Sequence, residues 1–200
     1  MSYPLDRQKI APYSAAIDIR FSYLGEDDID AYLRFRSHSN ADVIARRLRA
    51  GLTCVASWFG KDIVDAGWMA TGSAYVPYMK RHLLIDQGDV YTFDSWTAPG
   101  FRGRGIHAAR STFAGIQNQA DGFKRSISLV AFENYSAWFL LTYAGLETLG
   151  CYHYLRTPLR GFYWEKPETG RTLPSLVANP SRRSRNTPAT RQRLAFDRKS

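Results

Sequence analysis

Residues 90–120 hold the feature that most constrains the fold: a strand that runs into a glycine-rich loop and then a helix. Val90 to Thr97 is β-branched and aromatic, which favours a strand, and Pro99-Gly100 ends it. From Ile106 onward, apolar residues recur at helical spacing. We therefore expect the helix to begin within Arg102-Gly-Arg-Gly-Ile-His107.

This loop has the composition of an anion site. Gly103 and Gly105 lack a Cβ, so the backbone can turn tightly and a bulky anion can approach it. The free N–H groups of the first helical turn and the helix dipole favour negative charge there, and Arg102 and Arg104 add donors suited to phosphate. The loop has neither Gly-Lys-Ser/Thr nor Gly-x-Gly-x-x-Gly, which excludes a P-loop and a dinucleotide loop.

The rest of the chain predicts alternating strands and helices around this unit. In order, we expect a strand at 16–24, helices at 27–36 and 41–50, strands at 53–59 and 63–69, an irregular segment at 73–87, the strand at 90–97, the helix at 106–120, a strand at 125–132, a helix at 134–146 and two strands at 148–165. The helix between them should make strands 90–97 and 125–132 parallel neighbours in a right-handed unit.

Two segments resemble the GNAT superfamily of acyl-CoA-dependent N-acyltransferases. One is Arg102-x-x-Gly105-x-His107 after a strand, although His107 stands where the family usually has glycine or alanine. The other is Asn134-x-x-Ala137, followed by a helix and Gly145-Leu146. The resemblance covers residues 16–166 and implies an α/β fold. Its central mixed sheet would be mostly antiparallel, with one splayed parallel pair of strands and helices on its flanks.

The resemblance also implies a reaction. It predicts an N-acetyltransferase that moves an acetyl or other acyl group from acyl-CoA to a primary amine, by direct attack in a ternary complex and without a metal. The backbone of Trp96 and Thr97 would hold the acyl oxygen, and the N–H groups of Gly103 to Ala108 would hold the pyrophosphate. Asn134 would line the pantetheine or the thiol. The implied cofactor-binding residues are Trp96, Thr97, Arg102, Gly103, Arg104, Gly105, Ile106, His107, Ala108, Asn134 and Ala137. For His107, contact with a phosphate and simple packing are both open.

The proton transfers are less defined by the sequence. Asp94, Tyr91 and Glu133 are the candidate general bases, and Ser95 is a candidate relay through water. Each has a structural alternative: Asp94 as a partner for an arginine, Tyr91 as a packing residue, and Glu133 as a helix-end charge. Ordered water alone is a further candidate for removing the proton.

Position 141 departs from the family. Many members carry a tyrosine seven residues after the asparagine, where its hydroxyl protonates the departing thiolate, but this chain has Leu141. Tyr143 is about 200° further round the helix and should face elsewhere. A non-catalytic acyl-CoA sensor is therefore an alternative to the enzyme.

The charge is concentrated near the C-terminus. The chain carries a net charge of +9, and residues 167–200 hold eight Lys/Arg against two acidic residues, which is +6. We expect 167–200 to be a disordered basic tail and 1–15 an N-terminal extension. Such a tail suggests nucleic acid or an anionic membrane surface as a partner, although a solvated extension is the simpler interpretation. A nucleic-acid-binding protein is thus a second alternative function.

Composition sets the remaining expectations. Cys54 and Cys151 lie in strand-like runs, and the sequence shows neither a signal-peptide core nor a membrane-spanning run, so we expect a cytoplasmic protein. A homodimer is left open. Six aromatic residues near the expected cleft suit either the core or stacking on an acceptor: Trp58, Trp68, Tyr75, Tyr78, Trp96 and Trp138. No pattern identifies the acceptor.

Overall fold

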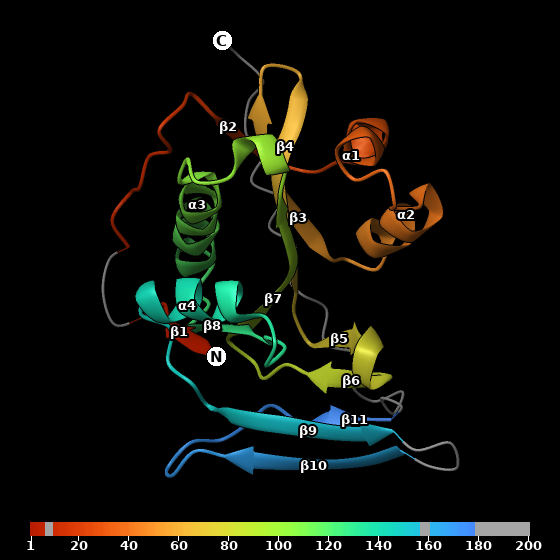
Figure 1. Cartoon of the computed structure of the whole chain (residues 1–200), viewed down its shortest axis with the longest axis vertical. Coiled ribbons are helices and arrows are strands. Elements are labelled where there is room, and N and C mark those ends of the chain that lie inside the picture. The colour runs from red at the N-terminus through yellow and green to blue at the C-terminus, as the bar shows by residue number, and fades with distance from the viewer. Residues whose placement is uncertain (7–9, 157–160, 179–200) are drawn as a thin grey trace.

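A six-stranded mixed sheet forms the centre of the protein (Figure 1). The structure is a computed structural model that describes residues 1–6, 10–156 and 161–178. The strand order is β1-β8-β7-β4-β3-β2, and only β7 and β8 run parallel. The strands are β1 (Ser2–Pro4), β2 (Arg20–Tyr23), β3 (Thr53–Phe59), β4 (Asp62–Ala70), β7 (Asp89–Thr97) and β8 (Arg125–Ser128).

The parallel pair confirms the central prediction from the sequence. The crossover between β7 and β8 is α3 (Ile106–Ala120), which begins directly after Gly105. Pairing runs from Asp89↔Arg125 to Thr92↔Ser128 and then stops, although β7 continues to Thr97. The last residues of β7 therefore face a gap on the β8 side, which is the splay that the fold prediction requires.

Helices cover both faces of the sheet (Figure 1). A 3-10 turn at Glu26–Asp28 leads into α1 (Ile29–Phe35) and then α2 (Ala41–Arg49), and both pack on one face over a core that includes Trp68. Asn40 caps α2 through its side chain, as its position in the sequence predicts. Helix α3 packs on the opposite face over a core that includes Val55 and Val90. The sheet thus separates an α1/α2 face from an α3 face.

A second, smaller sheet replaces the irregular segment that we expected at 73–87. Residues Ser73–Val76 (β5) and Arg81–Leu84 (β6) form a hairpin around a 3-10 turn at Pro77–Met79, and Leu176–Val177 (β11) pairs with β6. Val76 and Leu83 are buried in a core that the small sheet shares with Ala70, Tyr91 and Ile127 of the central sheet. The sequence prediction was wrong here because the alternation is short and is interrupted by Pro77.

The C-terminal elements lie beside this small sheet. Strands β9 (Gly150–Arg156) and β10 (Gly161–Pro167) form an antiparallel pair, as predicted, but they make a two-stranded sheet of their own. They follow helix α4 (Tyr135–Tyr143), which has no buried residue. Strand β8 ends at Ser128, earlier than the expected 132. No helix in the described part of the chain is long and apolar enough to span a membrane.

The two ends of the chain contribute more than the sequence suggested. Residues 2–4, which we expected in an N-terminal extension, form β1 and pair with β8, and Leu5 is fully buried. At the other end Leu176 is buried in β11, and Tyr152 donates a hydrogen bond to the Pro174 carbonyl. The expectation of a disordered tail from 167 is therefore wrong up to residue 178, and its remainder, 179–200, lies outside the described residues.

Candidate functional site

A β-bulge distorts β7 where it loses its parallel partner. Trp68 of β4 pairs with Phe93, but Ala66 pairs with Trp96, so two residues of β7 oppose Gly67 alone. Asp94, the first of the two, has a left-handed backbone with φ of 51°. A bulge of this kind kinks a strand and re-aims its side chains. As a result Asp94 and Trp96 lie on the α1/α2 face, whereas Ser95 and Thr97 lie on the α3 face.

The glycine-rich loop joins this distorted strand to α3. Gly103 and Gly105 have φ of 73° and 72°, values that favour glycine, and Gly105 is the residue before the first turn of α3. No side chain caps that turn, and the first helical hydrogen bond is donated by the Ala109 N–H. The N–H groups of residues 106–108 thus precede the first helical hydrogen bond, and groups in that position are the ones that bind anions at helix starts.

The two loop arginines stay close to the loop. Arg102 Nε donates to the Thr97 carbonyl at 3.1 Å, which ties the loop back to the end of β7. The Arg104 guanidinium lies 5.5 Å from the ring centre of Phe101, just before the loop. Both positive groups therefore stand near the uncapped helix start, whose partial charge is also positive, so the loop as a whole favours an anion.

The N-terminal segment also contacts the loop, a contact that no sequence pattern indicated. The Ala16 N–H donates to the Arg104 carbonyl at 2.9 Å. A Cβ built on Gly105 would stand 2.9 Å from the Tyr13 hydroxyl. Gly105 is therefore required both by its backbone conformation and by this close neighbour.

A buried charged cluster lies beneath the loop on the α3 face. Asp65 of β4 is fully buried and accepts hydrogen bonds from Arg110 Nε, from Thr97 Oγ1 at 2.7 Å and from Ser57 Oγ at 3.3 Å. Arg110 also donates to Ser95 Oγ at 3.1 Å. Burial by itself would raise the pKa of Asp65, but the His107 and Arg110 side chains and the Thr97 hydroxyl lower it to about 2. The cluster fastens the first turns of α3 to the splayed end of β7.

His107 belongs to this cluster. Its Nδ1 atom lies 3.1 Å from Arg110 Nη2 and 3.8 Å from Asp65 Oδ1. Nδ1 can accept from Arg110 in one tautomer of the ring, or carry a proton directed at Asp65 in the other. Of the two roles left open by the sequence, packing is the one that these contacts favour.

A second charged cluster lies on the α1/α2 face of the same strand end. Asp94 Oδ1 accepts from Arg36 Nη1 at 2.5 Å, and Asp94 Oδ2 accepts from Arg47 Nη1 at 2.7 Å. Arg36, at the end of α1, lies over the ring of Trp96, and Arg47, in α2, lies over those of Trp68 and Phe93. We call Arg36, Arg47, Asp94 and Trp96 the arginine cluster. Asp94 thus has the arginine-partner role that the sequence offered as an alternative to the base.

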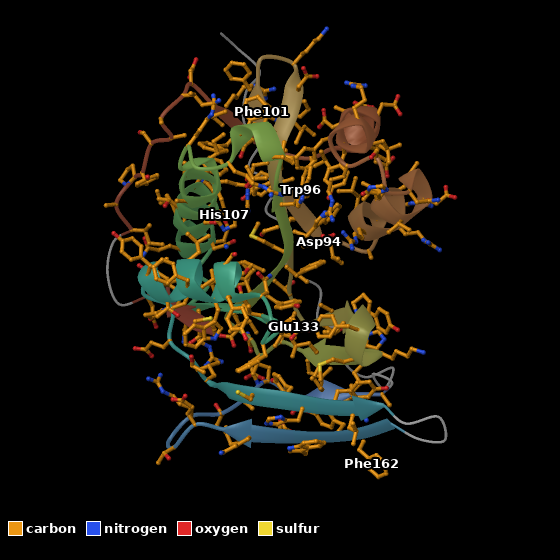
Figure 2. The ribbon with its side chains drawn as sticks, in the orientation of Figure 1. Asp94, Trp96, Phe101, His107, Glu133 and Phe162 are labelled. Carbon is orange, nitrogen blue, oxygen red and sulfur yellow. The ribbon has the colours of Figure 1, made fainter. Side chains whose placement is uncertain are left out.

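The other two candidate bases lie in unlike surroundings. Tyr91 is buried and stacks on Phe93, and burial raises its pKa well above the ordinary tyrosine value, so its phenol stays neutral. Glu133 is exposed, and in Figure 2 its label lies below that of Asp94. The three candidate bases thus differ in burial: one is buried, one is half-buried and paired with arginines, and one is exposed.

The second family-like segment forms the start of α4. The Asn134 side chain accepts from the Ala137 N–H at 3.2 Å, so these two residues form the N-cap of that helix. Leu141 is half-buried, and Tyr143 is 85% exposed and stacks on Phe139. The difference in exposure agrees with the expectation that Tyr143 faces a different direction from position 141.

The aromatic residues divide between core and surface. Trp58 and Trp68 are core residues, whereas Tyr75, Tyr78 and Trp138 are exposed. Trp96 is half-buried, with its ring 4.8 Å from that of Phe35 in an edge-on contact. Of the six, Trp96 is the one that the structure places at the splayed end of β7.

The chain matches no known family model and no curated protein sequence. Solved structures nevertheless share its fold. The aminoglycoside 6′-N-acetyltransferase AAC(6')-Ih from Acinetobacter baumannii aligns with a TM-score of 0.54 at 12% identity, over 70% of this chain and 98% of that chain. The ribosomal-protein-alanine N-acetyltransferase from Brucella melitensis biovar Abortus 2308 gives 0.53 at 11% identity, over 70% and 100%. AAC(6')-Iy in complex with CoA gives 0.54 at 14% identity, over 74% and 99%.

Proposed function

We propose that this chain, which has the fold of the GNAT acetyltransferases, is an acyl-CoA-dependent N-acyltransferase acting on a primary amine. The observation that carries the proposal is the uncapped start of α3 beside the splayed end of β7. A helix start with free N–H groups and two arginines suits a pyrophosphate. The gap after Thr92 leaves strand backbone unpaired, which suits a thioester that must lie along a strand.

In this proposal each part of the site has one task. The N–H groups of residues 106–108, with Arg102 and Arg104, hold the pyrophosphate. The β7 backbone at Trp96 and Thr97 holds the acyl oxygen, which gains negative charge as the amine attacks. The buried Asp65–Arg110 pair keeps the two parts in register, because it joins α3 to β7.

None of the three candidate bases, all of them within the described residues, is poised to accept a proton. Each carboxylate oxygen of Asp94 already accepts a hydrogen bond from an arginine, Tyr91 is a neutral buried phenol, and Glu133 is an exposed side chain. We therefore propose that the amine reacts from its neutral fraction and passes its proton to water. Leu141 has no proton to donate, so we assign protonation of the thiolate to solvent as well.

The test exploits the open space around Gly103. A Cβ there meets no atom within 4 Å, and asparagine and aspartate both tolerate the positive φ at that position. Gly103→Asp and Gly103→Asn are therefore a matched pair that differs in one charge. We expect the aspartate variant to bind CoA on the order of ten- to a hundredfold more weakly than the asparagine variant, as measured by calorimetry.

Equal CoA affinity in the two variants would show that the loop does not bind the phosphates of CoA. Gly105→Glu is a harsher test, which should abolish binding, but it also strains a left-handed backbone and meets Tyr13. Thiol release from acetyl-CoA with a panel of amines then separates an enzyme from a sensor. Tight CoA binding with no release for any amine would favour the sensor.

A further inference from the structure

We infer that the arginine cluster recognises the acceptor, and that the acceptor is an amine that also carries a carboxylate or phosphate group. This inference rests on the proposed function, since it assigns the second substrate of the same site. It concerns the side chains of Arg36, Arg47, Asp94 and Trp96, whereas cofactor binding as proposed above uses only the backbone of Trp96.

The position of the cluster follows from the two faces of the sheet. The glycine-rich loop and α3 lie on one face, so the cofactor occupies the α3 side of the splay. In a ternary complex the amine must reach the acyl carbon from a direction that the cofactor leaves free. At this end of β7 the bulge turns the side chains of Asp94 and Trp96 toward the opposite face of the sheet, the α1/α2 face (Figure 2).

The charges of the cluster do not balance. Two guanidinium groups share the single carboxylate of Asp94, which leaves a net charge of +1. Within the described residues neither arginine forms another ion pair. The side chains are 30%, 25% and 29% exposed for Arg36, Arg47 and Asp94, so solvent and a small ligand can reach them.

The arginines also keep donors for a ligand. Each guanidinium has five N–H groups. Asp94 takes one from each, and Tyr32 lies beside Arg36. The rings of Trp96, Trp68 and Phe93 hold the two guanidinium planes in place. Fixed, planar, forked donors are suited to carboxylate and phosphate oxygens.

The same cluster disfavours a polycationic acceptor. A multiply protonated amine such as an aminoglycoside would bring further positive charge next to two arginines that a single carboxylate does not neutralise. The acceptors named for several structures of this fold, among them sisomicin, are of that class. The fold is shared, but the charge on the α1/α2 face points to a different acceptor.

The experiment compares amines with and without an acidic group. The pairs are β-alanine against its amide and phosphoethanolamine against ethanolamine, with sisomicin as the polycationic case. Each is titrated into the CoA-saturated protein and assayed for thiol release with acetyl-CoA. We expect each acid to bind at least about tenfold more tightly than its partner without the acidic group, and the two pairs distinguish a carboxylate from a phosphate preference.

Variants of the cluster test the residues. Arg36→Gln with Arg47→Gln should reduce the preference for the acid by about ten- to a hundredfold. Arg49→Gln is the matched control, because Arg49 lies in the same helix but bonds only to the Ala45 carbonyl. Arg47→Lys keeps the positive charge but loses the forked donors of the guanidinium. CoA binding reports whether each variant is folded. An acid preference that is absent in the parent protein, or unchanged in the double variant, overturns the inference.

Asp94→Asn gives a second, independent readout. Asparagine fits the left-handed backbone, and the change frees both arginines for the acceptor. We expect the KM for the acidic amine to fall severalfold. A collapse of kcat with unchanged acceptor binding would instead identify Asp94 as the general base and overturn the inference. Retained acid preference without any thiol release would count against the transferase alone.

Discussion

Two charged clusters of similar composition lie on opposite faces of the same strand end, and they differ in burial. On the α3 face the Asp65 and Arg110 side chains are 0% and 6% exposed. The carboxylate of Asp65 accepts its hydrogen bonds from the side chains of Arg110, Ser57 and Thr97. On the α1/α2 face Asp94 pairs with two arginines that remain a quarter or more exposed. A buried pair is a fixed part of the framework, whereas an exposed one can exchange its partners with a ligand.

The comparison assigns a different role to each cluster. Separating a buried pair leaves an uncompensated charge in the interior, which is strongly destabilising. Separating an exposed pair changes stability little, because water replaces the lost partner. We therefore expect the Asp65 cluster to govern folding and the arginine cluster to govern acceptor choice. The predictions below test this division in order of expected effect.

The largest effect should come from Asp65→Asn. The side chain keeps its shape but loses its charge, so Arg110 is left buried without a counterion. We expect the free energy of unfolding to fall by about 3–5 kcal/mol in urea denaturation. A loss below about 1 kcal/mol would show that the buried pair does not hold α3 to the sheet.

Low pH should destabilise the parent protein through the same cluster. The pKa of Asp65 lies at about 2 when folded, below its ordinary value of 3.8. Its contribution to stability is thus complete above about pH 4 and is lost as the pH falls toward 2. The parent should lose roughly 2 kcal/mol more than Asp65→Asn across that window. Parallel pH profiles of unfolding for the two proteins would contradict this.

Gly67→Ala should disturb the cluster sterically. A Cβ at Gly67 would stand 2.3 Å from Arg110 Nη1, and the guanidinium cannot move without weakening its bond to Asp65. We expect a loss of about 1–3 kcal/mol in the free energy of unfolding. Gly100→Ala serves as the control, since a Cβ there meets nothing within 4 Å. Equal losses for the two variants would refute a specific clash with Arg110.

The smallest effect on stability should come from Asp94→Asn. Its two ion pairs are partly exposed, so the free energy of unfolding should change by no more than about 1 kcal/mol. Thermal and urea unfolding of Asp94→Asn and Asp65→Asn, measured under the same conditions, compares the two losses directly. A loss of unfolding free energy as large as that of Asp65→Asn would mean that both clusters stabilise the fold.

The strand, loop and helix around Gly105 were predictable because their signals are local. Residues favouring a strand end at Pro99, glycines follow, and a helical period begins at Ile106, all within a short stretch. The β7–β8 pairing then follows from the length of the crossover. Strand β1 was not predictable in this way, since three residues at the edge of a sheet carry no pattern until their neighbour is in place.

The buried cluster illustrates the same limit for the site. Asp65 lies within an apolar strand, and its partner Arg110 is 45 residues later in a helix that also holds other polar residues. Neither position is distinguished in the sequence. Asp94 was singled out as a base because it lies on the right strand, but its partners Arg36 and Arg47 come from two helices much earlier in the chain.

The sequence by itself determined the glycine-rich loop, the parallel pair of strands and the order of the elements apart from β1, β5, β6 and β11. The tertiary structure alone decided which charges are buried and which face each side chain occupies. The physical reason lies in the bulge opposite Gly67, where one extra residue in β7 reverses the alternation of every side chain that follows. That insertion placed Asp94 with the arginines and Thr97 with Asp65, and it depends on the pairing with β4 rather than on the residues of β7 alone.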